Sequence, residues 1–190
     1  MKTTTVGLFL ALLCAGCQVP AKGYRAVPES ELPLHGPTGI TFPATAGTLQ
    51  RRWVHEKLSD PRSVQVGYGT AAWIEIAPAG GGATAKLASM KRSLLVRHSD
   101  SAVTQPAAAV RGLFAGWKTA VLEHRAMLTE TARDPQDQPR RDFLAARKCG
   151  RYMLSARAWS VDPDNTEQLR QLGLAMREIF DDSCKHGASA

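Results

Sequence analysis

The apolar residues between positions 64 and 76 recur with a period of two, and this pattern restricts the fold more than any other feature of the chain. Six of them occupy even positions: Val64, Val66, Tyr68, Ala72, Ile74 and Ile76. A period of two is typical of strands that bury one face. Gly69-Thr70, in the middle of the run, is a Gly-X pair of the kind that closes a tight hairpin. The segment therefore predicts two antiparallel strands, residues 62–68 and 71–77.

Two other segments have the spacing of amphipathic helices. Residues 84–97 place one group of apolar side chains on a broad face: Leu87, Met90, Leu94 and Val96. Residues 166–185 follow a capping residue and share another apolar face: Leu169, Leu172, Met176, Ile179 and Phe180. Residues 47–59 fit either a short helix or an irregular strand. We therefore expect an internal helix and a long C-terminal helix.

The N-terminus has the form of a secretory signal, with Lys2 followed by a short apolar run. That run, about 8–12 residues, is too short to cross a hydrocarbon core of about 30 Å. Residues 13–17, Leu-Cys-Ala-Gly-Cys, resemble a bacterial lipobox. The resemblance implies that residues 1–16 are removed and that Cys17 carries lipid at the new N-terminus. Gln18 stands where inner-membrane lipoproteins usually have Asp, so an outer-membrane anchor facing the periplasm is implied.

Two of the four cysteines then remain for a disulfide. Cys14 would leave with the signal and Cys17 would be acylated, so Cys149 and Cys184 form the one remaining pair. Exported chains meet oxidising conditions, which favours a bridge between them. Closing this loop is expected to stabilise the fold by roughly 3 kcal/mol.

Residues 107–161 fit two interpretations. With a helical period they belong to a three-helix bundle beside a small hairpin. With Gly116 and Gly150 as turns they form strands near 107–114, 117–130, 140–148 and 151–160. The disulfide favours strands, because a C-terminal helix of about 27 Å would run back along a strand of about 30 Å and bring Cys184 to Cys149. A helix over 140–160 would leave the cysteines about 12 Å out of register, beyond the roughly 7 Å that a disulfide spans between Cα atoms.

These expectations combine into an α+β domain over residues 42–186. It has an antiparallel sheet of about six strands, with the internal helix and the long C-terminal helix packed on it. Residues 17–41, rich in proline and glycine, are expected to form a lipidated N-terminus and flexible tether, although Ile40-Thr41-Phe42 could add an edge strand. Residues 187–190 are expected to be a disordered tail.

The order of elements also carries a loose family resemblance. Its motifs are Phe42-Pro43, Arg51-Arg52, Val66-Gly67-Tyr68 and Trp73-Ile74-Glu75-Ile76-Ala77-Pro78. With the helix and hairpins that follow, they resemble a group of small bacterial envelope proteins, and the element order is similar to the PsbP/Mog1-like fold family. The resemblance implies a binding or assembly module and supplies no catalytic residue.

The chain is basic, with a formal net charge of +7. In the envelope such a domain attracts lipid phosphates, lipopolysaccharide and peptidoglycan carboxylates, whereas a secreted address argues against nucleic acid. One basic cluster lies around the predicted turn at Gly150: Arg140, Arg141, Arg147, Lys148 and Arg151. It is either a docking patch for anionic glycans or lipid headgroups, or a solvated outer face with charge partners elsewhere.

The sequence lacks the usual catalytic and metal-binding spacings. None of its five histidines stands four residues from another, Gly-x-Ser-x-Gly does not occur, and Cys-x-x-Cys occurs nowhere outside the predicted lipobox, where Cys14 and Cys17 have this spacing. The four tryptophans, Trp53, Trp73, Trp117 and Trp159, could stack a ligand, although packing is their commoner role. We therefore expect no metal, no cofactor and no enzymatic activity. The predicted function is a non-enzymatic binding or assembly lipoprotein with an envelope protein as partner; the alternative is an inhibitor or immunity lipoprotein that neutralises a toxin or hydrolase.

Overall fold

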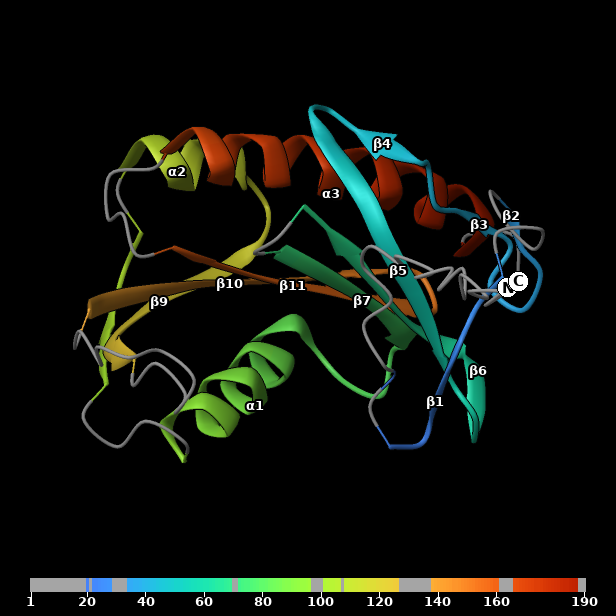
Figure 1. Ribbon diagram of the computed structural model, residues 1–190, viewed down its shortest axis with the longest axis horizontal. Coiled ribbons are helices and arrows are strands. Elements are labelled where there is room, and N and C mark those ends of the chain that lie inside the picture. Colours follow the sequence, from blue (N-terminus) through green and yellow to red (C-terminus); the bar gives the residue numbers. More distant parts are fainter. Residues whose placement is uncertain are drawn as a thin grey trace, which may run out of the picture.

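The computed structural model describes residues 20, 22–28, 34–69, 72–96, 101–106, 108–126, 138–160 and 166–187. They form an α+β domain built on a large antiparallel sheet (Figure 1). The strands are β1 Tyr24–Ala26, β2 Leu34–His35, β3 Ile40–Thr41, β4 Thr45–Ala46, β5 Leu49–Lys57, β6 Asp60–Tyr68, β7 Ala72–Pro78, β8 Ala102–Thr104, β9 Lys118–Ala126, β10 Gln138–Cys149 and β11 Tyr152–Ser160. The helices are α1 Ala83–Leu95, α2 Ala108–Leu113 and α3 Thr166–Gly187.

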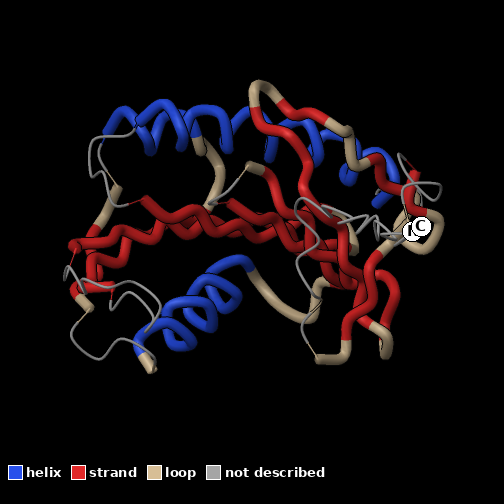
Figure 2. The backbone as a smooth tube through the Cα atoms, viewed as in Figure 1, coloured by secondary structure: helices blue, strands red, loops and turns tan. Residues whose placement is uncertain are grey.

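The main sheet and its helices form three layers. In the described residues the sheet has nine strands, ordered β1-β5-β6-β7-β11-β10-β9-β8, with β4 also paired to β5. Helices α2 and α3 cover one face and α1 lies against the other (Figures 1 and 2). The larger core fills the space under α3, and a smaller one joins Leu87 and Leu94 of α1 to Leu122 and Leu144. A separate pair, β2-β3, lies beside the end of α3 (Figure 1).

The predicted hairpin is confirmed, with the predicted faces. Val64 pairs with Ile76 and Val66 with Ile74, and all four side chains are buried in the core under α3. Gly69, at φ 59°, begins the connection. Period two in the sequence therefore reported the buried face correctly.

The predicted strands near 117–130, 140–148 and 151–160 are confirmed as β9, β10 and β11, which excludes the helical bundle. The strand predicted at 107–114 is wrong, because α2 occupies residues 108–113. Val110 and Phe114 lie four residues apart, so one helical turn buries both against α3. Gly173 of α3 makes room for this contact, since a Cβ there would lie 3.3 Å from the Phe114 ring.

The sheet is larger than the predicted six strands partly because residues 49–57 form a strand. Strand β5 pairs with β6, but the register shifts between Arg51 and Trp53 and again between Glu56 and Lys57. Such bulges break the strict alternation of side chains. This irregularity explains why the same residues also fitted a helical spacing.

The segment expected to be a tether is folded where the structure describes it. Residues 22–28 and 34–41 contain β1, β2 and β3. We call these two described stretches the N-terminal arm. The side chains of His35, Thr38 and Ile40 are at most 1% exposed. The folded part therefore begins before the expected boundary at Phe42, and Ile40–Thr41 pairs with β2 rather than extending the main sheet.

The return of α3 along the sheet follows the path that the disulfide prediction assumed. Helix α3 runs back alongside β10 and β11 (Figure 1), and the Arg147 guanidinium lies 4.0 Å from the centroid of the Phe180 ring. The C-terminal part of α3 is therefore near the end of β10 that carries Cys149. The side chain of Cys184 lies outside the described residues, so the Cys149–Cys184 bridge stays a prediction.

Candidate functional site

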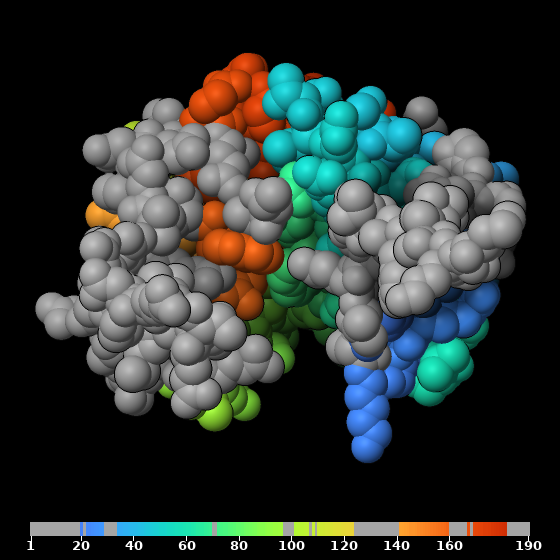
Figure 3. Space-filling model, viewed as in Figure 1, coloured from blue at the N-terminus to red at the C-terminus, as the bar shows by residue number. Residues whose placement is uncertain are grey.

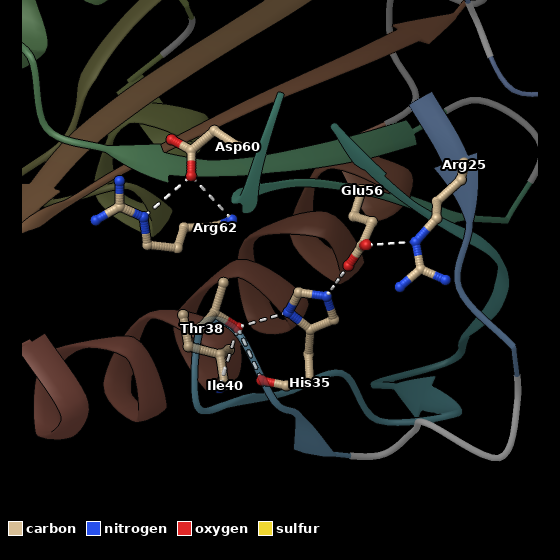
Figure 4. Close-up of polar contacts among 7 residues, drawn as sticks. All are labelled: Arg25, His35, Thr38, Ile40, Glu56, Asp60 and Arg62. Atoms are coloured by element: carbon tan, nitrogen blue, oxygen red, sulfur yellow. Dashed lines mark hydrogen bonds and ion pairs between the residues drawn. The ribbon is translucent and has the colours of Figure 1, made fainter. Parts of the chain in front are cut away.

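A buried polar network joins the N-terminal arm to the sheet (Figure 4). His35, at the end of β2, is completely buried, and Glu56 of β5 has 3% of its side chain exposed. The Nε2 of His35 donates a hydrogen bond of 2.8 Å to Oε2 of Glu56. The Nε of Arg25, from β1, donates to the other carboxylate oxygen. One carboxylate of the sheet therefore holds two separate parts of the arm.

Thr38 completes the surroundings of the imidazole. Its Oγ1 lies 3.0 Å from Nδ1 of His35 and accepts a hydrogen bond from the Ile40 backbone N–H. A hydroxyl can donate to a neutral ring nitrogen or accept from a protonated one, so His35 has a partner at both nitrogens in either charge state. The Tyr152 hydroxyl, from β11, donates to the Thr38 carbonyl at 3.0 Å. The turn between β2 and β3 is thus fixed to both β5 and β11.

The charges around Glu56 favour its ionised form. Burial is the largest single influence and opposes ionisation, but the hydrogen bonds from His35 and Arg25, with the positive charge of each, outweigh it. The pKa of Glu56 is therefore below its ordinary value. Because Glu56 binds His35 and Arg25 from two separate parts of the arm, this arrangement is suited to holding the arm on the sheet.

A second arrangement lies on the sheet face that carries α1. Register places Trp53, Gly67, Trp73 and Arg157 in one row across β5, β6, β7 and β11. Helix α1 packs on β9, β10 and β11, and in the described part of the chain no helix extends over β5 and β6 on this side (Figure 1). The space-filling view shows the molecule hollowed between α1 and the first described strand (Figure 3). We call the α1-side surface of β5, β6 and β7 the open face.

The tryptophans of the open face are held in place by their neighbours. The Trp53 indole stacks on the His55 ring, with centroids 4.5 Å apart, and leans over Gly67. A Cβ on residue 67 would lie 2.3 Å from the indole, so only glycine leaves room for it. Trp53 and Trp73 are both half-buried.

The next row of the open face is polar, and consists of His55, Gln65, Glu75 and Ser155. Oε2 of Glu75 accepts hydrogen bonds from Ser155 Oγ at 3.1 Å and from Lys86 Nζ at 2.5 Å. Burial, and then the negative charge of Glu75, raise the pKa of Tyr24, whose hydroxyl accepts a hydrogen bond from Gln65. A cavity of about 220 Å³ adjoins this row at the start of α1, lined by residues that include Pro78, Gly81 and Met153.

A buried ion pair lies between the open face and α1. Asp142 of β10 is fully buried and receives two hydrogen bonds from Arg157, at 3.2 Å and 2.9 Å. The same guanidinium lies 5.5 Å from the centroid of Trp159. This two-point pairing fixes the Arg157 side chain at the end of the tryptophan row.

The described members of the basic cluster predicted around Gly150 lie in different surroundings, and the anionic-ligand patch stays a prediction. Arg141 forms a 2.9 Å ion pair with Glu123 and stands six residues from Arg147, about 20 Å along the strand. Arg147 packs on Phe180 instead of facing solvent freely. Only Lys148 and Arg151 are exposed together at the turn. The side chain of Arg140, like all of Cys17, lies outside the described residues.

The described tryptophans lie in different surroundings. Trp117 contacts Phe114 and Phe180 at the edge of the core, as expected for packing. Trp53 and Trp73 instead share the open face. No local pattern indicates the His35–Glu56 pair, because its members lie 21 residues apart and match no motif.

Comparisons with known proteins give no family for this chain. No protein-family model matches it, and no curated protein matches it. Among the described residues, no group of three His, Cys, Asp or Glu side chains could hold a metal ion. Within the same residues, no helix has the length and apolar character needed to cross a bilayer.

Proposed function

We propose that this protein is an outer-membrane lipoprotein, anchored through Cys17, whose periplasmic domain is a non-enzymatic binding module in the cell envelope. The proposed anchor is supported by the charged start, the short apolar run and the small residues before Cys17. The folded arm fits this role, because Arg25 and His35 fasten the chain that follows the anchor to the domain.

The observation that carries the binding role is the open face. Trp53 of β5 and Trp73 of β7 lie in one row on the open face, and Arg157 of β11 ends this row beside α1. Tryptophan, tyrosine and arginine are the residues most enriched at the centres of protein–protein interfaces. They present a large contact area and lose little side-chain entropy when they are already held by neighbours. We therefore assign the open face to an envelope protein partner.

The test is affinity capture of the acylated protein from solubilised envelopes, with Trp73→Ala and Arg92→Ala compared with the wild type. Arg92 is exposed on α1, away from the open face, and serves as the control. The proposal expects one partner in stoichiometric amount with the wild type and with Arg92→Ala, and at least tenfold less with Trp73→Ala. Equal recovery by both variants, or recovery of bulk lipid alone, contradicts it.

The identity of the captured protein separates this role from the alternative. A secreted hydrolase or toxin whose activity falls when the lipoprotein binds would show an inhibitor or immunity protein. A structural envelope component would show an assembly module. Both outcomes place the contact on the open face.

A further inference from the structure

The first described residues of the N-terminal arm, which follow Cys17 in the sequence, lie beside a small basic and apolar surface. Strand β1 pairs antiparallel with β5, so Tyr24 stands opposite Lys57. The Leu58 backbone N–H donates to the Gly23 carbonyl at 2.9 Å. The turn between β5 and β6 therefore lies beside the first described residues of the arm. We call Lys22, Lys57, Leu58 and Arg62 the tip.

The tip combines positive charge with an exposed apolar side chain. Leu58 is 61% exposed. Lys22 and Lys57 are exposed, and Arg62 is 60% exposed while it binds Asp60 at 3.0 Å (Figure 4). Arg62 and Lys57 both act on the Asp60 carboxylate, and with Lys22 the three cations of the tip outnumber this one carboxylate. Cations around an exposed apolar residue match the interface of an anionic bilayer.

Covalent geometry limits how far the tip can be from the anchor. Lys22 follows Cys17 by five residues, and five residues span at most about 18 Å when fully extended. Because β1 already belongs to the main sheet, these five residues set the largest distance between the folded domain and the lipid. The tip is therefore the described surface that the covalent chain holds nearest to the bilayer.

We infer that the tip rests on the anionic lipid headgroups of the leaflet that holds Cys17, so that the domain stands on the membrane with β1 and the β5–β6 turn downward. This inference rests on the proposed function, since it needs the anchor at Cys17. It orients the molecule. The open face and the tip both include residues of β5 and β6, so a partner on the open face approaches close to the bilayer.

The test compares amide hydrogen exchange of residues 56–62 in the acylated protein on two kinds of vesicle. One is phosphatidylcholine alone and the other contains phosphatidylglycerol. We expect at least threefold slower exchange of the Leu58 and Ser59 amides on the anionic vesicles, and loss of this difference in Lys22→Ser/Lys57→Ser and at high salt. Lys148→Ser/Arg151→Ser removes the same charge from the β10–β11 turn and should keep the difference.

Each outcome bears on one proposal. Intact mass first establishes whether Cys17 is acylated. Equal exchange on both vesicles by an acylated protein overturns the membrane contact and leaves the anchor standing. An unacylated Cys17 overturns the proposed function; the same unacylated chain is then sedimented with the anionic vesicles. Sedimentation lost in Lys22→Ser/Lys57→Ser supports the tip, and failure to sediment overturns it.

Discussion

His35 and Glu56 come from opposite sides of a boundary that composition alone would place between tether and domain, yet a 2.8 Å hydrogen bond joins them in the interior. Neither side chain is more than 3% exposed. Arg25 reaches the same carboxylate from β1, with 45% of its own side chain exposed. The arm is thus part of the folded domain, and Glu56 holds two separate parts of it.

Removal of the Glu56 carboxylate should strongly destabilise the protein. Glu56→Ala leaves the buried imidazole and the Arg25 guanidinium without their acceptor, and the loss of one member of a buried pair typically costs about 3–5 kcal/mol. Urea unfolding followed by tryptophan fluorescence measures this. Glu123→Ala is the control, because the Glu123–Arg141 pair is more than 40% exposed on both sides and should contribute less than about 1 kcal/mol. Equal losses in the two variants would show that the network does not hold the arm.

The same carboxylate should make stability depend on acid. The folded state lowers the pKa of Glu56 below its ordinary value of 4.5, so the unfolded chain takes up its proton first as the pH falls. The stabilisation is complete above this value and is lost as the pH drops through 4.5 towards the folded pKa. The unfolding free energy of the wild type minus that of Glu56→Gln should therefore be constant near neutral pH and shrink below 4.5. A difference that stays unchanged down to the most acidic pH sampled contradicts this assignment.

A methyl group at Gly67 should disturb the tryptophan row. The new Cβ would lie 2.3 Å from the Trp53 indole, which must move away from its stack on His55. Overpacking of this kind costs about 1–3 kcal/mol, and Trp53→Ala should remove most of that cost in a double-mutant cycle. The measurements are urea midpoint and tryptophan emission. Gly80→Ala, which meets nothing within 4 Å, should leave both unchanged.

The predicted disulfide can be tested by mass and stability together. An intact Cys149–Cys184 bridge adds two mass units on reduction, and Cys149→Ser and Cys184→Ser should each lower stability by roughly 3 kcal/mol under oxidising conditions. Reduced wild type and the two variants should then unfold at similar urea concentrations. If reductant changes neither the mass nor the stability of the wild type, the bridge is absent.

Sequence reasoning succeeded where structure is local and periodic. The alternation of apolar residues from Val64 to Ile76 predicted which side chains are buried. The apolar face of α3 could be predicted from the spacing within the helix itself. The assignment of β10 and β11 used one long-range constraint, the expected sulfur bridge, because propensity alone left those residues ambiguous. The strands predicted from this constraint match the observed pairing of β10 with β11, although the bridge itself remains a prediction.

The failures all involve contacts distant in sequence. The arm is rich in proline and glycine, as tethers are, and its order comes from Glu56 and Tyr152, which lie far along the chain. Residues 108–113 form a helix that packs against α3, where Gly173 leaves room for the ring of Phe114. The open face was hidden for the same reason, since Trp53 and Trp73 become neighbours in a row only when β5, β6 and β7 pair.

Among the described residues, the edge of the sheet at β5 is covered by short strands alone. Strand β4 pairs with its first two residues, and β1 with residues 55–57. Proteolysis that freed the domain by cutting after β1 would strip away one of these covers and leave backbone donors and acceptors of a nine-residue strand unpaired. Open strand edges recruit further chains into β-aggregates. If the chain is anchored as proposed, such a cut would therefore release a particle prone to self-association.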